Sequence, residues 1–84
     1  MNFALNAMSI VPILKSREIL KLLLQLGFKI ISQKGSHIKL EHIIDRTRKV
    51  ILPFHNRDLK RGTHQSILKQ AKIPLKEFLK LLGN

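Results

Sequence analysis

The hydrophobic pattern of this chain changes its period at Gly27, and this change limits the folds that are open to it. Residues 16–26 carry apolar side chains at helical spacing, with Ser16 placed to cap a helix and Gly27 placed to end it. The residues that follow are rich in β-branched and aromatic types or alternate with period two, as strands do. The sequence therefore predicts a helix followed by a sheet. The buried stripe of this helix is expected to be Ile19, Leu20, Leu23 and Leu26.

The segment after Gly27 predicts a three-stranded antiparallel meander. Residues 28–33 and 36–42 form a hairpin around a turn at residues 34 and 35, and residues 48–53 form the third strand. Strand parity then divides the second strand between two faces. Because Ile38 and Leu40 point to the core, His37 and Lys39 lie side by side on the opposite, open face.

Two further helices are expected after a basic loop at residues 54–62. Thr63 would cap a helix that buries Ile67 and continues to about residue 70, and Pro74 would begin a shorter helix. The apolar face of this last helix is expected to be Leu75, Phe78, Leu79 and Leu82. The order describes an α+β fold, a two-layer α-β-β-β-α sandwich like a double-stranded-RNA-binding domain, with a short extra C-terminal helix.

Size and charge limit the domain count and the partners. A chain of 84 residues has material for one core, and we expect a single domain over residues 13–84. Sixteen Lys and Arg against five Asp and Glu give a formal net charge of +11, which attracts nucleic acid first, and an acidic membrane or protein second. The same charge favours a monomer when the protein is free. The absence of cysteine excludes disulfides and thiolate metal sites and suits the cytoplasm.

The first twelve residues are apolar but do not match a targeting signal. No positive charge precedes the apolar part, Pro12 interrupts it, and it is shorter than the roughly 20 apolar residues that span a bilayer. We therefore expect no export and no membrane span. Residues 1–12 are interpreted as an N-terminal extension, with Met8 as an alternative start site.

The order and spacing of several segments resemble the HicA family of toxin–antitoxin systems. The segments are a leucine-rich helix ending in Leu26-Gly27-Phe28, then Gly35-Ser36-His37, Ile51-Leu52-Pro53-Phe54-His55, and Lys60-Arg61-Gly62-Thr63 followed by Ile67-Leu68-Lys69-Gln70-Ala71. This resemblance implies the toxin of a type II system, an mRNA interferase with a fold similar to double-stranded-RNA-binding domains. It also implies a HicB-like antitoxin that covers the active histidine, for which His37 is the matching residue. Gly62 and Thr63 match positions that we interpret as structural.

The chemistry of histidine supports this implication in part. RNA is cleaved when a base removes the proton of a 2′-hydroxyl and that oxygen attacks the adjacent phosphorus, and imidazole exchanges protons near neutral pH. A nearby cation such as Lys39 would stabilise the charge that develops on the phosphate oxygens. One histidine does not easily serve as base and acid at once. A second group or water therefore assists, or His37 acts as the general acid alone.

The remaining polar residues divide into expected phosphate ligands and residues for which a structural or solvent role is favoured. Phosphate contacts are expected from the hairpin and the basic loop, at Lys34, Ser36, Lys39, Arg57, Lys60 and Arg61. For His42, His55 and His64 a structural or solvent role is favoured, and strand parity places His42 on the face opposite His37. A zinc site needs about four converging ligands that this sequence lacks, so we expect an activity without metal or cofactor. Two alternatives stay open, a non-catalytic RNA-binding module and a module that docks an acidic protein.

Overall fold

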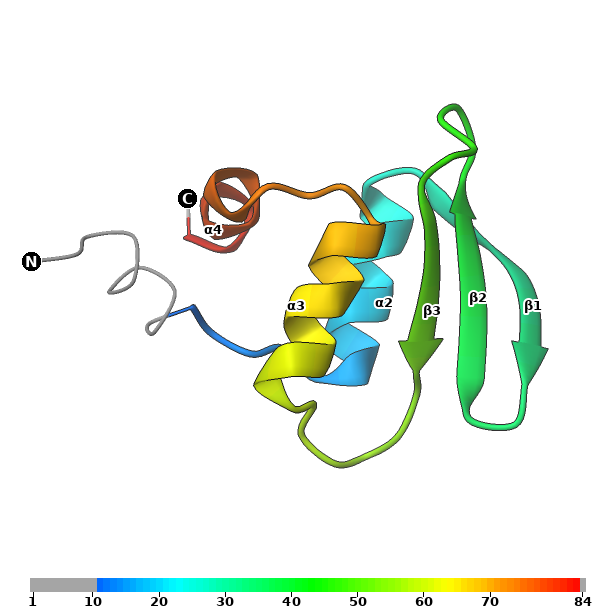
Figure 1. The fold of residues 1–84 in the computed structure, drawn as a ribbon, viewed down its shortest axis with the longest axis horizontal. Coiled ribbons are helices and arrows are strands. Elements are labelled where there is room, and N and C mark those ends of the chain that lie inside the picture. The colour runs from blue at the N-terminus through cyan, green and yellow to red at the C-terminus, as the bar shows by residue number, and fades with distance from the viewer. Residues whose placement is uncertain (1–10, 84) are drawn as a thin grey trace, which may run out of the picture.

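The computed structural model describes residues 11–83, in which one helix, three strands and two helices follow one another in the predicted order (Figure 1). The helices are α2 (Ser16–Gln25), α3 (Arg61–Gln70) and α4 (Leu75–Gly83), and the strands are β1 (Phe28–Lys34), β2 (His37–His42) and β3 (Lys49–Pro53). The strands form one antiparallel sheet in the order β1-β2-β3. The α+β fold and its extra C-terminal helix are confirmed. The expected N-terminal extension and the start site at Met8 fall mainly in residues 1–10, which lie outside the described residues.

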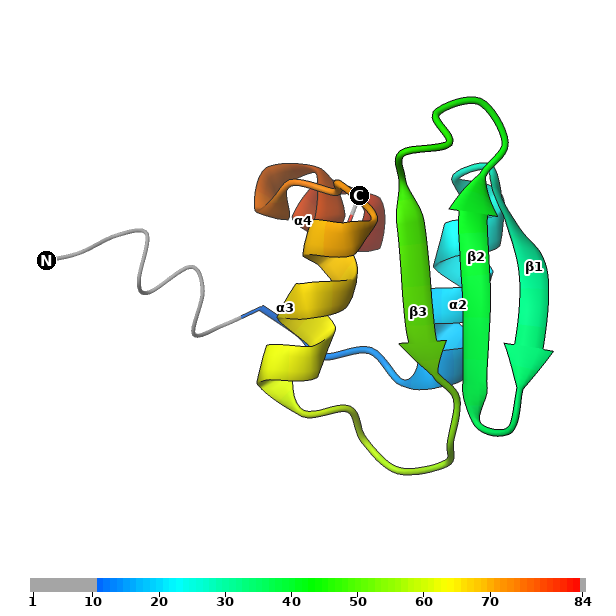
Figure 2. The same ribbon diagram turned by 45° about the vertical axis from the view of Figure 1, so that its right-hand side comes forward.

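Helices α2 and α3 cover one face of the sheet, and α4 lies on the far side of these helices from the sheet (Figures 1 and 2). The sheet contributes Leu40, Val50 and Leu52 to the core, each with 0% exposure, which confirms the predicted inner face of β2. Phe78 of α4 is also completely buried. The second face of the sheet is left without a covering element in the part of the chain that the structure describes.

Helix α2 begins differently from the prediction. Lys15 is the N-cap residue, and its backbone N–H donates to the Glu18 carboxylate at 2.8 Å. Ser16 lies inside the helix and is completely buried, and its hydroxyl donates to the carbonyl oxygen of Pro53 at 2.7 Å. The predicted serine cap is therefore wrong, because the hydroxyl finds a tertiary partner. That bond ties the start of α2 to the end of β3.

The predicted cap of α3 is wrong as well. Lys60 is the N-cap residue with an extended backbone, and the bond from the His64 N–H to the Lys60 carbonyl starts the helix ahead of Thr63. Thr63 consequently lies within the first turn. The predicted burial of Ile67 is confirmed at 1% exposure, whereas Leu82 of α4 is 37% exposed and lies at the rim of the core.

The hairpin turn is shifted by one residue from the prediction. Lys34 is the last residue of β1 and pairs with His37, so Gly35 and Ser36 form the two-residue turn. Gly35 occupies the first central position with φ of +57°, the left-handed conformation that a type II′ turn requires there. Lys34 is thereby placed directly opposite His37.

None of the helices in residues 11–83 is long and apolar enough to cross a membrane.

Candidate functional site

His37 is the first residue of the central strand, on the open face of the sheet. It pairs in register with Lys34 of β1 on one side and with Pro53 of β3 on the other. Directly opposed residues of antiparallel strands share a face and have Cβ atoms about 4.5–5.5 Å apart. The exposed imidazole therefore has a lysine as one of its two directly opposed cross-strand neighbours. A substrate can reach it from the solvent side of the sheet.

Four exposed lysines from all three strands share this face with His37. Lys39 follows His37 on the same face and pairs with Ser32 and Ile51, while Lys29 and Lys49 both pair with Glu41. We call the face formed by Lys29, Lys34, Lys39, Lys49 and His37 the basic sheet face. It brings together the predicted residues Lys34, Lys39 and His37. Lys29 and Lys49 were not predicted, although parity applied to β3 would have found Lys49.

Glu41 organises the far end of the basic sheet face. Its side chain is 9% exposed because Arg46 donates to its Oε1 from Nε at 2.9 Å and Lys49 lies 3.9 Å from its Oε2. The hydrogen bond from Arg46 lowers the pKa of the Glu41 carboxyl, and the charges of Arg46, Lys49 and Lys29 lower it further. The carboxylate stays ionised and holds the surrounding cations in place.

A hollow of about 440 Å³ adjoins the His37 end of the face. Its lining includes Pro53, which lies opposite His37, together with the predicted residues Arg57 and Lys60. The Phe54 N–H donates to the Ser36 carbonyl at 2.6 Å and fastens the start of this loop to the hairpin turn. In Figure 1 the loop and the turn lie at the same end of the sheet. Ser36, Arg57 and Lys60 are thus grouped at the end of the sheet where β2 begins.

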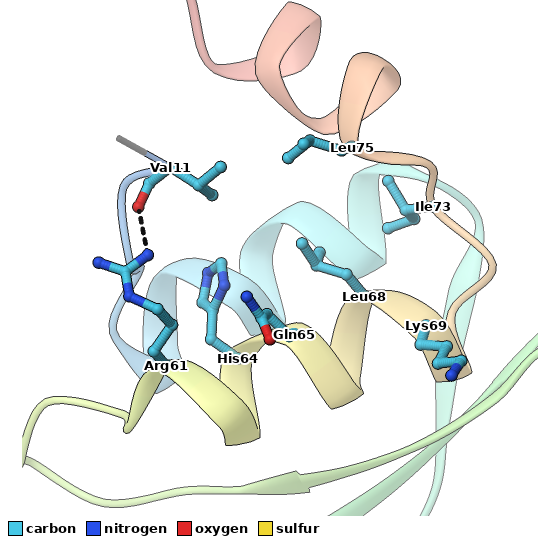
Figure 3. Close-up of a pocket in the computed structure, with 8 residues that line it drawn as sticks. All are labelled: Val11, Arg61, His64, Gln65, Leu68, Lys69, Ile73 and Leu75. Atoms are coloured by element: carbon cyan, nitrogen blue, oxygen red, sulfur yellow. Dashed lines mark hydrogen bonds between the residues drawn. The ribbon is translucent and has the colours of Figure 1, made fainter. Parts of the chain in front are cut away.

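Arg61, another predicted phosphate ligand, contacts a different part of the fold. Its Nη1 donates to the Val11 carbonyl at 3.3 Å, and the side chain lines a cavity of about 220 Å³ beside α3 (Figure 3). The remaining lining residues are His64, Gln65, Leu68, Lys69, Ile73 and Leu75. Arg61 is therefore turned toward the segment before α2, and it does not line the hollow that Arg57 and Lys60 share.

The other histidines have structural surroundings. The His42 ring lies 3.0 Å from the Leu26 carbonyl through Nε2, and its Nδ1 accepts two backbone N–H bonds, so the ring organises a loop. His55 is half-buried and lines the hollow of the β3–α3 loop. His64 is 1% exposed and packs edge-on against Phe78, with 5.3 Å between ring centroids. Residues 11–83 contain no group of three His, Asp or Glu side chains that could hold a metal ion.

The burial of His64 makes the stability of the protein depend on pH. Burial lowers the pKa of His64, and the positive charge of Arg61 lowers it further. Because the folded pKa lies below the unfolded value of about 6.5, the unfolded chain binds more protons as the pH falls. Unfolding is therefore favoured in acid. We expect the melting temperature to fall between pH 7 and pH 5, measured by circular dichroism.

The variant His64→Leu tests whether His64 causes this pH dependence of stability. His64→Leu removes the titrating group and keeps an apolar side chain in the site, so its melting temperature should change less over the same range. The range stops at pH 5 because the pKa values of the Glu41 and Asp45 carboxyls are also lowered, and their contribution is lost only in stronger acid. Equal slopes for His64→Leu and wild type would show that another group causes the pH dependence.

The fold and the site together define a small, strongly basic α+β protein that presents one histidine on an open, lysine-rich sheet face. A family model for the HicA toxin of bacterial toxin–antitoxin systems matches residues 16–73, from the first residue of α2 to the segment after α3. The chain belongs to the HicA toxin family and is a toxin of such a system. A search of curated proteins gave no match to it. Helix α4 lies outside the matched range.

Proposed function

We propose that this toxin is an endoribonuclease that binds and cleaves mRNA in the cytoplasm and thereby arrests translation and growth. The observation that carries the proposal is the position of His37 in a Gly-Ser-His element on the basic sheet face, exposed and directly opposite Lys34. A titratable imidazole surrounded by cations is suited to proton transfer beside a phosphate. The HicA family assignment supports the toxin role, and this geometry supports the chemistry.

The reaction uses the proton-transfer chemistry of His37. As a base, the imidazole removes the proton of a 2′-hydroxyl, and the freed oxygen attacks the neighbouring phosphorus while the bond from phosphorus to the 5′-oxygen breaks. The leaving 5′-oxygen then takes a proton from water. If His37 acts as the acid, it supplies that proton and water removes the first one. In both cases Lys34 and Lys39 stabilise the negative charge that grows on the phosphate oxygens.

The basic sheet face gives the RNA backbone a path past His37. Lys29 and Lys49 lie toward one end of the sheet, and the hollow lined by Arg57 and Lys60 adjoins the other end. A strand that follows these cations crosses His37 on the way. The hydroxyl of Ser36, in the adjacent turn, is available for a further phosphate contact. Binding of this kind reads charge and backbone rather than base sequence.

A HicB-like antitoxin completes the proposal by covering the His37 surface. The partner is expected to be acidic where it meets the basic sheet face, because opposite potentials speed association and this rate falls as ionic strength rises. Covering His37 would block both RNA access and proton exchange with solvent. The toxin is a monomer when free of this partner.

Cleavage of RNA in the presence of EDTA tests the function. We expect the purified toxin to fragment total cellular RNA without a divalent metal, with the products resolved on a denaturing gel. Loss of cleavage in EDTA with recovery in magnesium would contradict the metal-independent mechanism. RNA binding without any cleavage, with or without magnesium, would make the protein a non-catalytic RNA-binding module.

A further inference from the structure

Two adjacent isoleucines stand out from the surface of the β2–β3 loop. Ile43 is 58% exposed and Ile44 is 84% exposed, and we call this pair the isoleucine tip. In Figures 1 and 2 the loop projects from the end of the sheet opposite the β1–β2 turn. At about 3.3 Å of rise per strand residue, the tip lies about 20 Å along β2 from His37. It is therefore a surface separate from the candidate catalytic site.

The loop is held in one conformation by hydrogen bonds on both sides of the tip. Nδ1 of the His42 ring accepts the N–H groups of Ile44 at 3.1 Å and Asp45 at 3.0 Å, and the Ile43 N–H donates to the Gly27 carbonyl at 2.9 Å. Gly27 also makes room for the ring, because a Cβ at this position would lie 3.1 Å from its Nε2. The His42 ring is thus the support of the tip.

The second half of the loop is fixed in the same way. The Asp45 carboxylate accepts from both the N–H and the hydroxyl of Thr47, at 3.1 and 2.6 Å. Nζ of Lys72 donates to the Thr47 hydroxyl at 2.7 Å and ties the loop to the end of α3. A loop that exposes two large apolar side chains in a fixed conformation has already lost much of the conformational entropy that binding would cost.

The chemistry of the tip favours a protein partner over RNA. Isoleucine has no aromatic face on which a base could stack, whereas a branched aliphatic side chain fits an apolar pocket of a protein and excludes water there. Arg46 and Lys49 lie beside the tip with side chains that are 79% and 62% exposed. An apolar anchor within a basic rim fits an apolar pocket within an acidic rim.

We propose that the isoleucine tip is a docking anchor that inserts into an apolar pocket of the antitoxin, about 20 Å along the sheet from His37. The proposal rests on the antitoxin partnership in the proposed function. It adds a contact that does not cover His37. Antitoxin binding and RNA cleavage can therefore be separated by mutation, because removal of the anchor leaves the basic sheet face unchanged.

The test compares Ile44→Ser with Leu24→Ser, which changes another exposed aliphatic residue, 46% exposed, on α2. The probe is the purified cognate HicB-like antitoxin, with affinity measured by titration calorimetry and RNA cleavage measured in parallel. Ile44→Ser should weaken the affinity about ten- to hundredfold, the range expected for one buried isoleucine, and should cleave RNA as wild type does. Leu24→Ser should bind the antitoxin within about twofold of wild type.

Three outcomes would contradict the proposal that the isoleucine tip is a docking anchor. Ile44→Ser could bind the antitoxin as wild type does, both variants could lose affinity equally, or Ile44→Ser could lose RNA binding and keep its affinity for the antitoxin, which would place the tip against RNA. Equal melting temperatures would show that the variants are folded. If even the wild type fails to cleave RNA, the ribonuclease proposal fails while the calorimetry still decides the anchor.

Discussion

Replacing His37 with alanine is expected to lower the rate of RNA cleavage about 10²- to 10⁴-fold, the usual contribution of a positioned acid or base. His37 is exposed at the first position of β2, so its removal should leave stability within about 0.5 kcal/mol. RNA binding should persist, because the lysines of the basic sheet face remain. In cells the variant should no longer arrest growth.

Initial rates in EDTA on a defined RNA measure this effect, with circular dichroism to show folding and fluorescence anisotropy to show binding. Lys29→Ala is the matched control, since it removes a side chain from the same face near its other end. It should weaken binding and keep cleavage at saturating RNA. Wild-type rates for His37→Ala would mean that another residue, or a contaminating nuclease, carries out the reaction.

The sequence predicts the order of the elements because each has its own period and a clear stop signal. Gly27 and Gly35 both take positive φ, at +97° and +57°, at the positions where the pattern requires a change of direction. The sequence did not predict the N-cap residues of α2 and α3 correctly. The hydroxyl of Ser16 bonds to the Pro53 carbonyl, 37 residues away, and local spacing contains no information about that partner. A tertiary contact therefore decided the start of α2, which the sequence misplaced.

Strand parity predicted which residues share the face of the candidate site only where the residues lie on one regular strand. His37 and Lys39 lie two residues apart on one strand, so their common face follows from the sequence. Lys29 and Lys34 are five residues apart, which parity would place on opposite faces. The structure has a bulge between Ile30 and Ser32 that shifts the register, and both lysines reach the face of His37. A bulge of this kind leaves no periodic signal in the sequence.

Arg61 shows a second limit of prediction from sequence. It follows Lys60 in a basic loop, and composition treats the two alike. In the fold Lys60 ends the loop and lines the hollow, whereas Arg61 starts α3 and reaches the carbonyl of Val11, 50 residues away. The direction of each side chain depends on where the helix begins, and the sequence placed the cap of α3 three residues late, at Thr63 in place of Lys60.

Phe78→Ala is expected to have the largest effect on stability, about 3–5 kcal/mol of unfolding free energy, as is usual for a buried phenylalanine. Phe78 has no exposed surface and packs against His64, so its removal leaves a cavity between α4 and α3. Domains of this kind are stable by about 5–15 kcal/mol in total. Such a loss would take a large share of the stability.

The result decides whether α4 belongs to the folding unit, because the matched family range ends at residue 73, before this helix begins. Urea unfolding followed by circular dichroism gives the free energy, and Leu81→Ala, in the same helix and 42% exposed, is the control that should cost far less. A cost below about 1 kcal/mol for Phe78→Ala would mean that α4 can detach while the rest stays folded. A large cost would show that this helix stabilises α3, and through it the end of the loop that carries Arg57 and Lys60.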